Sequence, residues 1–192
     1  MLKKLYYKIL DLSAKPRSEI ILSLVSFAES SIFPIPPDVL LLPMTLARPL
    51  KWIRLALITT IFSVLGGMLG YLIGMFLWES FGEQIINIYH LENNYEIFKN
   101  NYNDNGAIIV FLAGFTPIPY KLITIASGGL QLNILTFLLA SILSRGLRFF
   151  IIAGIIRIFG NIAKKYIEKY FNTLSTIIGI IVVVVAAIWL YL

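Results

Sequence analysis

Two apolar stretches of this chain are each interrupted near the middle by closely spaced prolines. The first stretch covers residues 18–47 and the second covers residues 106–130. The interrupting prolines are Pro34, Pro36, Pro37, Pro117 and Pro119. Because proline lacks a backbone N–H and its ring clashes with the preceding turn, a helix must stop at each cluster. The remaining arms reach about half of the ~30 Å hydrocarbon thickness of a bilayer. We therefore predict two re-entrant helical hairpins, each entering a membrane, turning near its midplane and returning to the same side.

Three further apolar segments are uninterrupted and predict membrane-spanning helices. They cover residues 53–78, 132–156 and 173–192, and each provides roughly the ~20 residues that a helix needs to cross the bilayer. With 58% hydrophobic and only 14% charged residues, the composition argues against a soluble domain. Residues 1–17 place apolar and basic side chains on opposite helical faces, which predicts an amphipathic helix at the membrane surface. The expected fold is an all-α membrane protein whose membrane domain covers residues 18–160.

The distribution of charged residues predicts how these segments are oriented. Basic residues flank the first hairpin on both sides, namely Lys3, Lys4, Lys8, Lys15, Arg17, Arg48, Lys51 and Arg54. The region after the 53–78 segment contains mostly acidic residues, namely Glu79, Glu83, Glu92, Glu96 and Asp104, with Lys99 as the counterexample. Since cytoplasmic loops are enriched in Lys and Arg, we expect a cytoplasmic N-terminus and a second hairpin that enters from the outer side.

The two hairpins also form an internal repeat. The segments FPIPPDVLLLPM and TPIPYKLITIAS align on their prolines, and in the spans that follow, Gly66 aligns with Gly146 and Gly74 with Gly154. Because the charges give the two copies opposite orientations, the repeat is inverted, which is typical of transporters whose site lies where the repeats meet. Gly66, Gly70 and Gly74 recur every four residues, and we interpret them as small residues for close helix packing.

Five charged residues lie inside the apolar segments, namely Glu29, Asp38, Lys121, Arg145 and Arg148. Each costs a few kcal/mol or more at the bilayer centre unless it is paired or solvated. Asp38 and Lys121 occupy equivalent positions of the repeat, two residues after the second proline of each PIP. One interpretation is a salt bridge that locks the hairpins together. The other is a site that binds an anion and exchanges protons or sodium.

The chemistry of these residues fits a phosphate. Arg145 and Arg148 are three residues apart on one helix face, and guanidinium groups bind phosphate oxygens bidentately. Helix arms that restart after the prolines can direct unpaired N–H groups inward. We therefore predict that Lys121, Arg145 and Arg148 bind the substrate and that Glu29 and Asp38 couple it to protons or cations. An alternative for Glu29 is a helix cap or a hydrogen bond to the broken backbone.

Other functions are disfavoured by the residue types present. The chain has no cysteine and one histidine, His90, which lies in a polar stretch, so we expect neither a metal site nor another cofactor. The basic residues lie in short clusters between apolar runs rather than on one face, which disfavours nucleic acid as a partner. No serine–histidine, paired-aspartate or metal-ligand motif occurs in the apolar segments, so we do not expect an enzyme.

Three motifs, SFAESSIFPIPPDVLLLPMTLARP, AGFTPIPYKLITIASGG and SRGLRFFIIAG, resemble the DedA family, also called SNARE-associated or VTT-domain proteins, and in particular its YqaA-like branch. The resemblance covers residues 20–160. It implies a bacterial inner-membrane protein with two facing re-entrant hairpins, from a family linked to lipid translocation and to envelope homeostasis that depends on the proton motive force. Family substrates include undecaprenyl phosphate and phosphatidylethanolamine, and eukaryotic relatives are similar to lipid scramblases. By motif position, Glu29 and Asp38 resemble the family's required acidic pair, and Arg145 and Arg148 resemble its arginine motif.

We therefore expect a multi-pass carrier or flippase that moves a phospholipid or polyprenyl phosphate across the inner (plasma) membrane. Expected partners are membrane lipids and protons or sodium, and the chain can also form a homo-oligomer. Two alternatives remain: a non-transporting structural or regulatory membrane protein of envelope homeostasis, and an ion channel.

Overall fold

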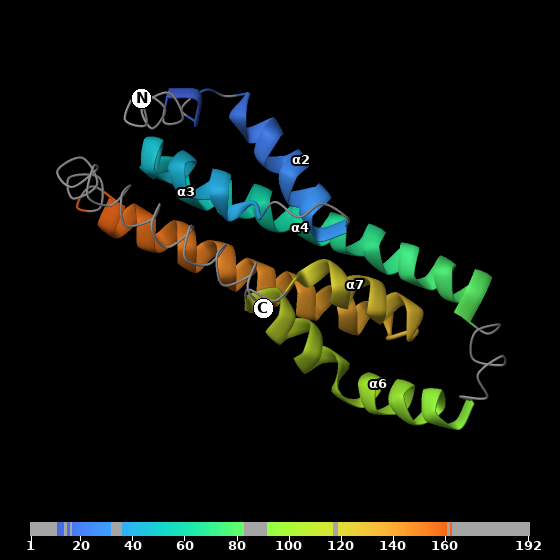
Figure 1. Ribbon diagram of the computed structural model, residues 1–192. Helices are drawn as coiled ribbons and strands as arrows, with labels where there is room; N and C mark the ends of the chain where they lie inside the picture. The colour runs from blue at the N-terminus through green and yellow to red at the C-terminus, as the bar shows by residue number, and fades with distance from the viewer. Residues whose placement is uncertain are drawn as a thin grey trace, which may run out of the picture.

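Every element in the described part of the computed structural model is helical (Figure 1). The structure describes residues 11–13, 15, 17–31, 36–82, 92–116, 119–160 and 162. In chain order the elements are α2 (Ser18–Ser31), α3 (Asp38–Ala47), the 3-10 turn η1 (Pro49–Lys51), α4 (Trp52–Leu77), the π-helical turn η2 (Trp78–Gly82), α6 (Glu92–Phe115), α7 (Tyr120–Gly129) and the helix Ile134–Gly160. The all-α prediction is confirmed for these residues. Most of the expected 1–17 helix, the 173–192 segment, His90, Pro34 and Pro117 lie outside the described residues.

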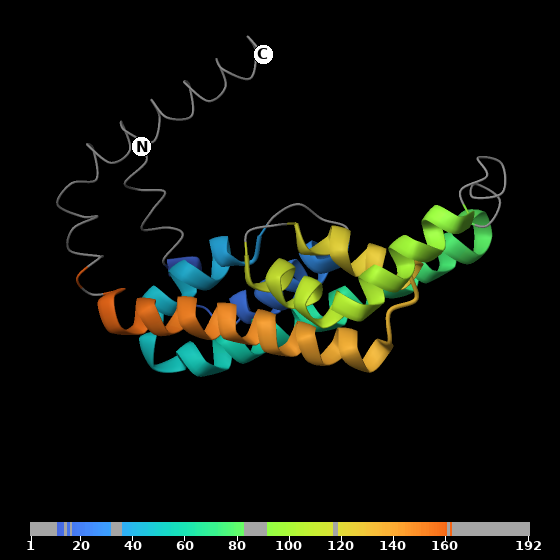
Figure 2. The ribbon, with the colours of Figure 1, turned by 90° about the horizontal axis from the view of Figure 1, so that it is seen from below.

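Within the described ranges, two helices are long and apolar enough to cross a membrane, as predicted for the 53–78 and 132–156 segments. They are Pro49–Phe81, which contains α4, and Ile134–Gly160, drawn in orange in Figure 1. A Cβ atom on Gly146 would lie 3.8 Å from Thr60, and one on Gly154 would lie 3.7 Å from Trp52. Since later residues of one helix meet earlier residues of the other, the two helices run antiparallel and side by side (Figure 2).

The proline clusters separate α2 from α3 and α6 from α7. Pro37 directly precedes α3, and Pro119 directly precedes α7. The ring of proline fixes φ near the helical value, so these positions suit a helix start although they end the preceding helix. α6 begins at Glu92, upstream of residue 106 where we expected the second hairpin to start. We placed the start at residue 106 because the polar residues before it are unfavourable in hydrocarbon. Polar residues can still form a helix outside the hydrocarbon, so α6 begins earlier.

In both helix pairs the second helix returns toward the start of the first. Arg48, which follows α3, donates hydrogen bonds to Glu19 at 2.8 Å and to Ser18 at 3.0 Å, at the beginning of α2. Leu130, which follows α7, accepts a hydrogen bond at 3.4 Å from Asn103 in the middle of α6. Each pair therefore has the shape of a hairpin with the proline-containing break at its tip.

Each helix pair packs around its own hydrophobic core. One core joins α2 and α3 to the start of α4 and the end of Ile134–Gly160; its buried residues are Leu22, Leu41, Met44, Leu55, Ala56, Phe149 and Ala153. The other joins α6 and α7 to the end of α4 and the start of Ile134–Gly160; its buried residues are Tyr71, Tyr102, Val110, Tyr120, Leu130, Leu132, Phe137 and Ala140. The two pairs thus occupy opposite ends of the two long helices, and the tips of both pairs face the middle.

The glycines of α4 allow this arrangement. A Cβ atom on Gly66 would collide with the backbone carbonyl of Phe27 in α2, and one on Gly74 would collide with the carbonyl of Ile125 in α7. A Cβ atom on Gly70 would collide with the side chain of Thr124. The predicted role of these three glycines in close helix packing is confirmed, and it brings both hairpins against one helix.

Candidate functional site

Arg145 lies at the centre of the molecule, between the two hydrophobic cores. Its side chain is only 3% exposed, and its guanidinium donates to Glu29 at 2.7 Å and to Ser63 at 2.6 Å. The same guanidinium lies over the rings of Tyr120 and Phe149, with centroid distances of 4.8 and 4.7 Å. Because Glu29 belongs to α2, Ser63 to α4 and Tyr120 to α7, one side chain of Ile134–Gly160 holds elements of both helix pairs together.

Arg148 lies nearly one turn further along the same helix and also joins the two pairs. It donates to the carboxylate of Asp38 at 2.5 Å and to the backbone carbonyl of Thr116 at 2.7 Å, with the carbonyl of Phe115 at 3.4 Å. Asp38 is the first residue of α3, where a negative charge interacts favourably with the helix dipole. The carbonyl of Phe115 lacks its usual helical partner because Pro119 has no N–H. Arg148 therefore connects the start of α3 to the C-terminal end of α6.

At the tip of the first hairpin, a side chain also takes the place of a backbone N–H that a proline cannot provide. In a continuous helix the carbonyl of Ser30 would accept from residue 34, which is a proline. The hydroxyl of Thr124, in α7 of the other pair, lies 3.4 Å from this carbonyl instead. At both breaks, a side chain from outside the hairpin thus approaches a carbonyl that the proline leaves without a donor.

The two ion pairs differ in how completely their polar atoms are bonded. The side chains of Arg148 and Asp38 are 18% and 19% exposed, against 3% and 14% for Arg145 and Glu29. Asp38 Oδ1 and Arg148 Nε are buried and have no hydrogen-bond partner among the described residues. A buried polar atom without a partner costs about 1–3 kcal/mol, so this pair retains capacity for one more donor and one more acceptor.

Small polar residues extend the network around Arg145, and sequence reasoning missed them. Ser30 and Ser63 share a hydrogen bond of 2.7 Å, and Ser30 donates to Glu29 at 3.0 Å. The hydroxyl of Tyr120 donates to Ser141 at 2.5 Å. The available signal was helical spacing, because Ser141 lies one turn before Arg145 on the arginine-bearing face.

Lys121 is half-buried in the first turn of α7, and Asp38 is half-buried in the first turn of α3. The structure shows an ion pair of Asp38 with Arg148. Glu29 is likewise bound by an arginine rather than acting as a helix cap.

A second buried charge cluster lies at the open end of the first hairpin. Glu19, which sequence reasoning did not identify, accepts from Arg48 at 2.8 Å and from Arg54 at 2.9 Å. The side chains of Glu19 and Arg48 are only 11% and 10% exposed. Arg48, interpreted from sequence as an orientation signal, thus also closes the α2/α3 hairpin.

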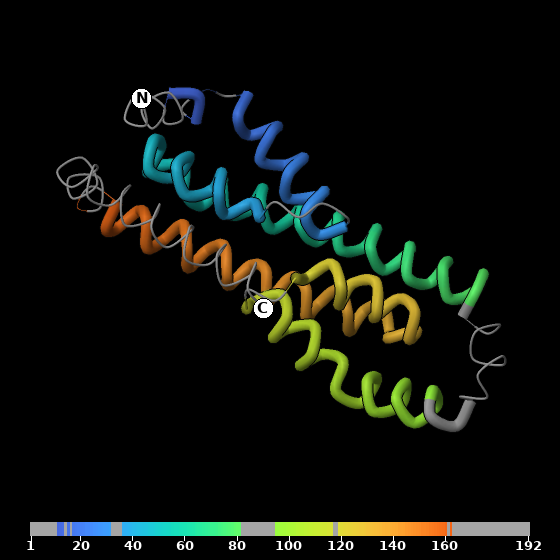
Figure 3. Tube along the Cα trace, viewed as in Figure 1, coloured from blue at the N-terminus to red at the C-terminus, as the bar shows by residue number. Residues whose placement is uncertain are grey.

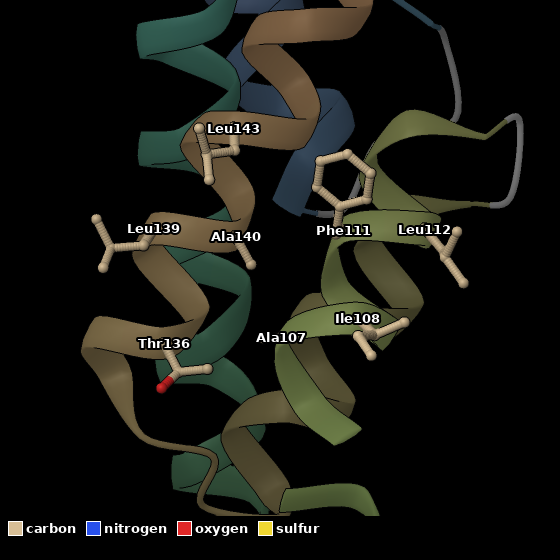
Figure 4. A pocket seen from close by; sticks show the side chains of 8 residues that line it. All are labelled: Ala107, Ile108, Phe111, Leu112, Thr136, Leu139, Ala140 and Leu143. Atoms are coloured by element: carbon tan, nitrogen blue, oxygen red, sulfur yellow. The ribbon is translucent and has the colours of Figure 1, made fainter. Parts of the chain in front are cut away.

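An apolar groove of about 450 Å³ lies between α6 and Ile134–Gly160, on the side of the second helix pair (Figure 4). Its lining residues are Ala107, Ile108, Phe111, Leu112, Thr136, Leu139, Ala140 and Leu143. In Figure 4 the side chain of Ala140 points toward α6, and Leu139 and Leu112 lie on the two outer sides. The tube view in Figure 3 follows the chain from the end of α6 through the break to α7 and then to Ile134–Gly160.

Comparisons with known proteins agree with the resemblance read from the motifs. The family model of the VTT domain matches residues 35–158. A protein of Haemophilus influenzae described as uncharacterized is 35% identical over 184 residues, which cover 96% of this chain and 93% of the relative. A homologous uncharacterized protein of Histophilus somni is 32% identical over 171 residues, which cover 89% of this chain and 87% of the relative. No solved structure matches the chain.

Proposed function

The chain belongs to the VTT-domain (DedA) family of membrane proteins, and from this premise we propose that it is a carrier for an anionic lipid, either a phospholipid or a lipid phosphate. The observation that carries the proposal is Arg148, which lies where both helix breaks meet and whose buried Nε has no hydrogen-bond partner among the described residues. Phosphate oxygens are the acceptors that a guanidinium binds best, because two parallel N–H groups match their spacing.

In this proposal the α2/α3 and α6/α7 pairs are re-entrant hairpins of an inverted repeat, with the N-terminus cytoplasmic and the protein in the inner membrane. Two observations support the arrangement: the pairs pack at opposite ends of two antiparallel helices, and their tips approach each other around Arg145 and Arg148. Broken backbone at membrane depth requires shielding by protein, which the side-chain contacts at Ser30, Phe115 and Thr116 provide.

The geometry of Arg148 suggests how an anion is exchanged for the carboxylate. An incoming phosphate competes with Asp38 for the guanidinium, since both are anionic oxygen acceptors. If the phosphate takes this place, Asp38 is left in a partly buried site without a cation, where a proton or a sodium ion stabilises it. Substrate binding and cation uptake are then linked through one arginine.

The other predicted site residues receive distinct roles in this mechanism. Arg145 and Glu29 hold the two hairpin tips in register, since Arg145 is almost fully buried and bound on several sides. Lys121, at the start of α7, adds a positive charge at the second hairpin tip.

Reconstitution in liposomes tests the proposal. Fluorescent phospholipids and a fluorescent lipid phosphate would be followed across the membrane, with and without a pH gradient. We expect movement with wild-type protein, strong loss with Arg148→Ala and partial activity with Arg148→Lys, which keeps the charge but not the fork. Arg157→Ala is the matched control, because Arg157 is an exposed arginine of the same helix. Equal lipid movement for the wild type and Arg148→Ala would contradict the carrier mechanism.

One observation favours the alternative of a non-transporting structural protein: both ion pairs fasten the α2/α3 pair to Ile134–Gly160, as a purely structural lock would. Exchanging the charges in the double variant Asp38→Arg, Arg148→Asp distinguishes the two. A structural lock regains function in the double variant. A carrier regains stability but not lipid movement, because the guanidinium no longer lies beside the carbonyls of Thr116 and Phe115.

A further inference from the structure

The groove between α6 and Ile134–Gly160 leads toward Arg148. The second half of α6 and the first half of Ile134–Gly160 run in the same direction, since Gly106 meets Leu132, just before that helix, and Gly114 meets Ser144 further along. Arg148 reaches the carbonyls of Phe115 and Thr116 directly after this second contact. Along Ile134–Gly160, Arg148 lies five residues, or ~7.5 Å, beyond Leu143 at the inner end of the groove.

The groove has the size and chemistry of a site for a hydrocarbon chain. Its volume of about 450 Å³ lies within the ~300–1,000 Å³ of ordinary ligand sites. Seven of its eight lining residues are apolar, and the eighth is Thr136. Two of the lining residues are Ala107 and Ala140, whose short side chains leave space that larger residues would fill.

We propose that this groove holds one hydrocarbon chain of the lipid whose anionic headgroup lies at Arg148. The inference rests on the proposed carrier function and specifies how the substrate is recognised. The guanidinium of Arg148, whose Nε has no hydrogen-bond partner among the described residues, attracts the anion, and the apolar groove that ends ~7.5 Å away along the helix takes the attached chain. An amphiphile of one charged end and one long chain satisfies both features at once, whereas a free phosphate satisfies only the first.

Photolabelling tests the groove directly. Full-length protein in phosphatidylcholine nanodiscs would be mixed with dodecyl phosphate that carries a diazirine at the chain end, irradiated and mapped by mass spectrometry. We expect adducts concentrated on residues 106–112 and 136–143. Ala107→Phe fills the groove from its exposed wall and should lower this labelling by about tenfold, as expected for losing the burial of two methylene groups.

Matched variants give each result a distinct meaning. Leu135→Phe enlarges an exposed residue of the same helix outside the groove and should leave labelling unchanged. Ala140→Phe repeats the test from the other wall, and a thermal unfolding scan identifies which variants are folded. Arg148→Ala should reduce labelling by dodecyl phosphate because the headgroup loses its partner. Partition of the probe into the nanodisc is the same for every variant, so differences report on the protein.

The outcomes separate this inference from the carrier function. Labelling spread evenly over lipid-facing residues, with no effect of Ala107→Phe, overturns the groove as a site even if the wild type moves lipids in liposomes. Groove labelling in a protein that moves no lipid supports the site and overturns the carrier function instead. A change of oligomeric state in Ala107→Phe, with no groove labelling of the wild type, would assign the groove to a second copy of the chain and overturn the inference.

Discussion

The two long helices, α4 and Ile134–Gly160, follow corresponding hairpins in the sequence but contact those hairpins by different means. α4 approaches them through glycines, with Gly66 against the backbone of α2 and Gly74 against the backbone of α7. Ile134–Gly160 reaches them through arginines, and its own Gly154 has only ordinary van der Waals contacts. The two helices are equivalent in the predicted repeat, but they differ in their contacts. α4 makes the close backbone packing, and Ile134–Gly160 makes the polar contacts.

A second contrast lies within Ile134–Gly160 itself. Arg145 and Arg148 are three residues apart and each bonds a carboxylate. Arg145 is enclosed by two rings and two serines, whereas Nε of Arg148 has no hydrogen-bond partner in the described part of the chain. Burial and bonding, rather than residue type, therefore distinguish a group that holds the fold from one that can bind a ligand. Four substitutions test both contrasts.

Arg145→Ala should have the largest effect on stability. Removing one partner of a buried ion pair leaves Glu29 without its cation, and we expect a loss of about 3–5 kcal/mol in the free energy of unfolding. The measurement is unfolding of purified protein in nanodiscs. The double variant Arg145→Met, Glu29→Leu should recover most of the loss, because it leaves no buried charge. If Arg145→Ala lowers the free energy of unfolding less than Arg148→Ala does, Arg145 is not the arginine that holds the fold.

Gly66→Ala should be the next most costly change. The new methyl group would collide with the carbonyl of Phe27, and neither backbone can move without separating α4 from α2. Overpacking of this kind costs about 1–3 kcal/mol, measured by the same unfolding experiment. Gly66→Ser tests the mechanism, since a larger residue at this position should be more destabilising than alanine. Tolerance of both substitutions would remove the basis for treating α4 as the packing helix.

Arg148→Ala should lower stability less than Arg145→Ala while abolishing lipid movement. Losing charge-assisted hydrogen bonds in a partly exposed position costs about 1.5–3 kcal/mol. Unfolding and liposome transport measured on the same preparation give the comparison. The informative quantity is the loss of transport relative to the loss of unfolding free energy. If Arg148→Ala loses stability but retains transport, Arg148 holds the fold and does not bind the lipid.

Gly154→Ala should have the smallest effect, and of opposite sign. The nearest atom to the added methyl group, on Trp52, lies at an ordinary contact distance of 3.7 Å. Alanine is favoured over glycine in a helix by about 0.5–1 kcal/mol, so we expect unchanged or slightly higher stability. A clear loss in the unfolding experiment would show that Ile134–Gly160 depends on its glycines as α4 does.

The sequence predicted the breaks, the long helices and the need for partners, but it did not predict which partners are chosen. A proline disrupts a helix at its own position, so the regions where α2 and α6 end could be located from the positions of the prolines in the sequence. Pairing depends on how helices rotate and approach one another, and symmetry suggested Lys121 for Asp38 but did not suggest the ion pair with Arg148. Glu19 was missed because its partners, Arg48 and Arg54, come close only when the hairpin closes.

The bonds from Arg148 to the carbonyls of Phe115 and Thr116 have a mechanical consequence. The guanidinium acts as a detachable C-terminal cap of α6, standing in for an amide that Pro119 cannot supply. Any occupant that draws the arginine away uncaps this helix end and leaves two peptide oxygens to find water or another donor. In the proposed carrier, loading of the site and fraying of the last turn of α6 are therefore one event, and amide hydrogen exchange at residues 112–116 would report occupancy without a labelled substrate.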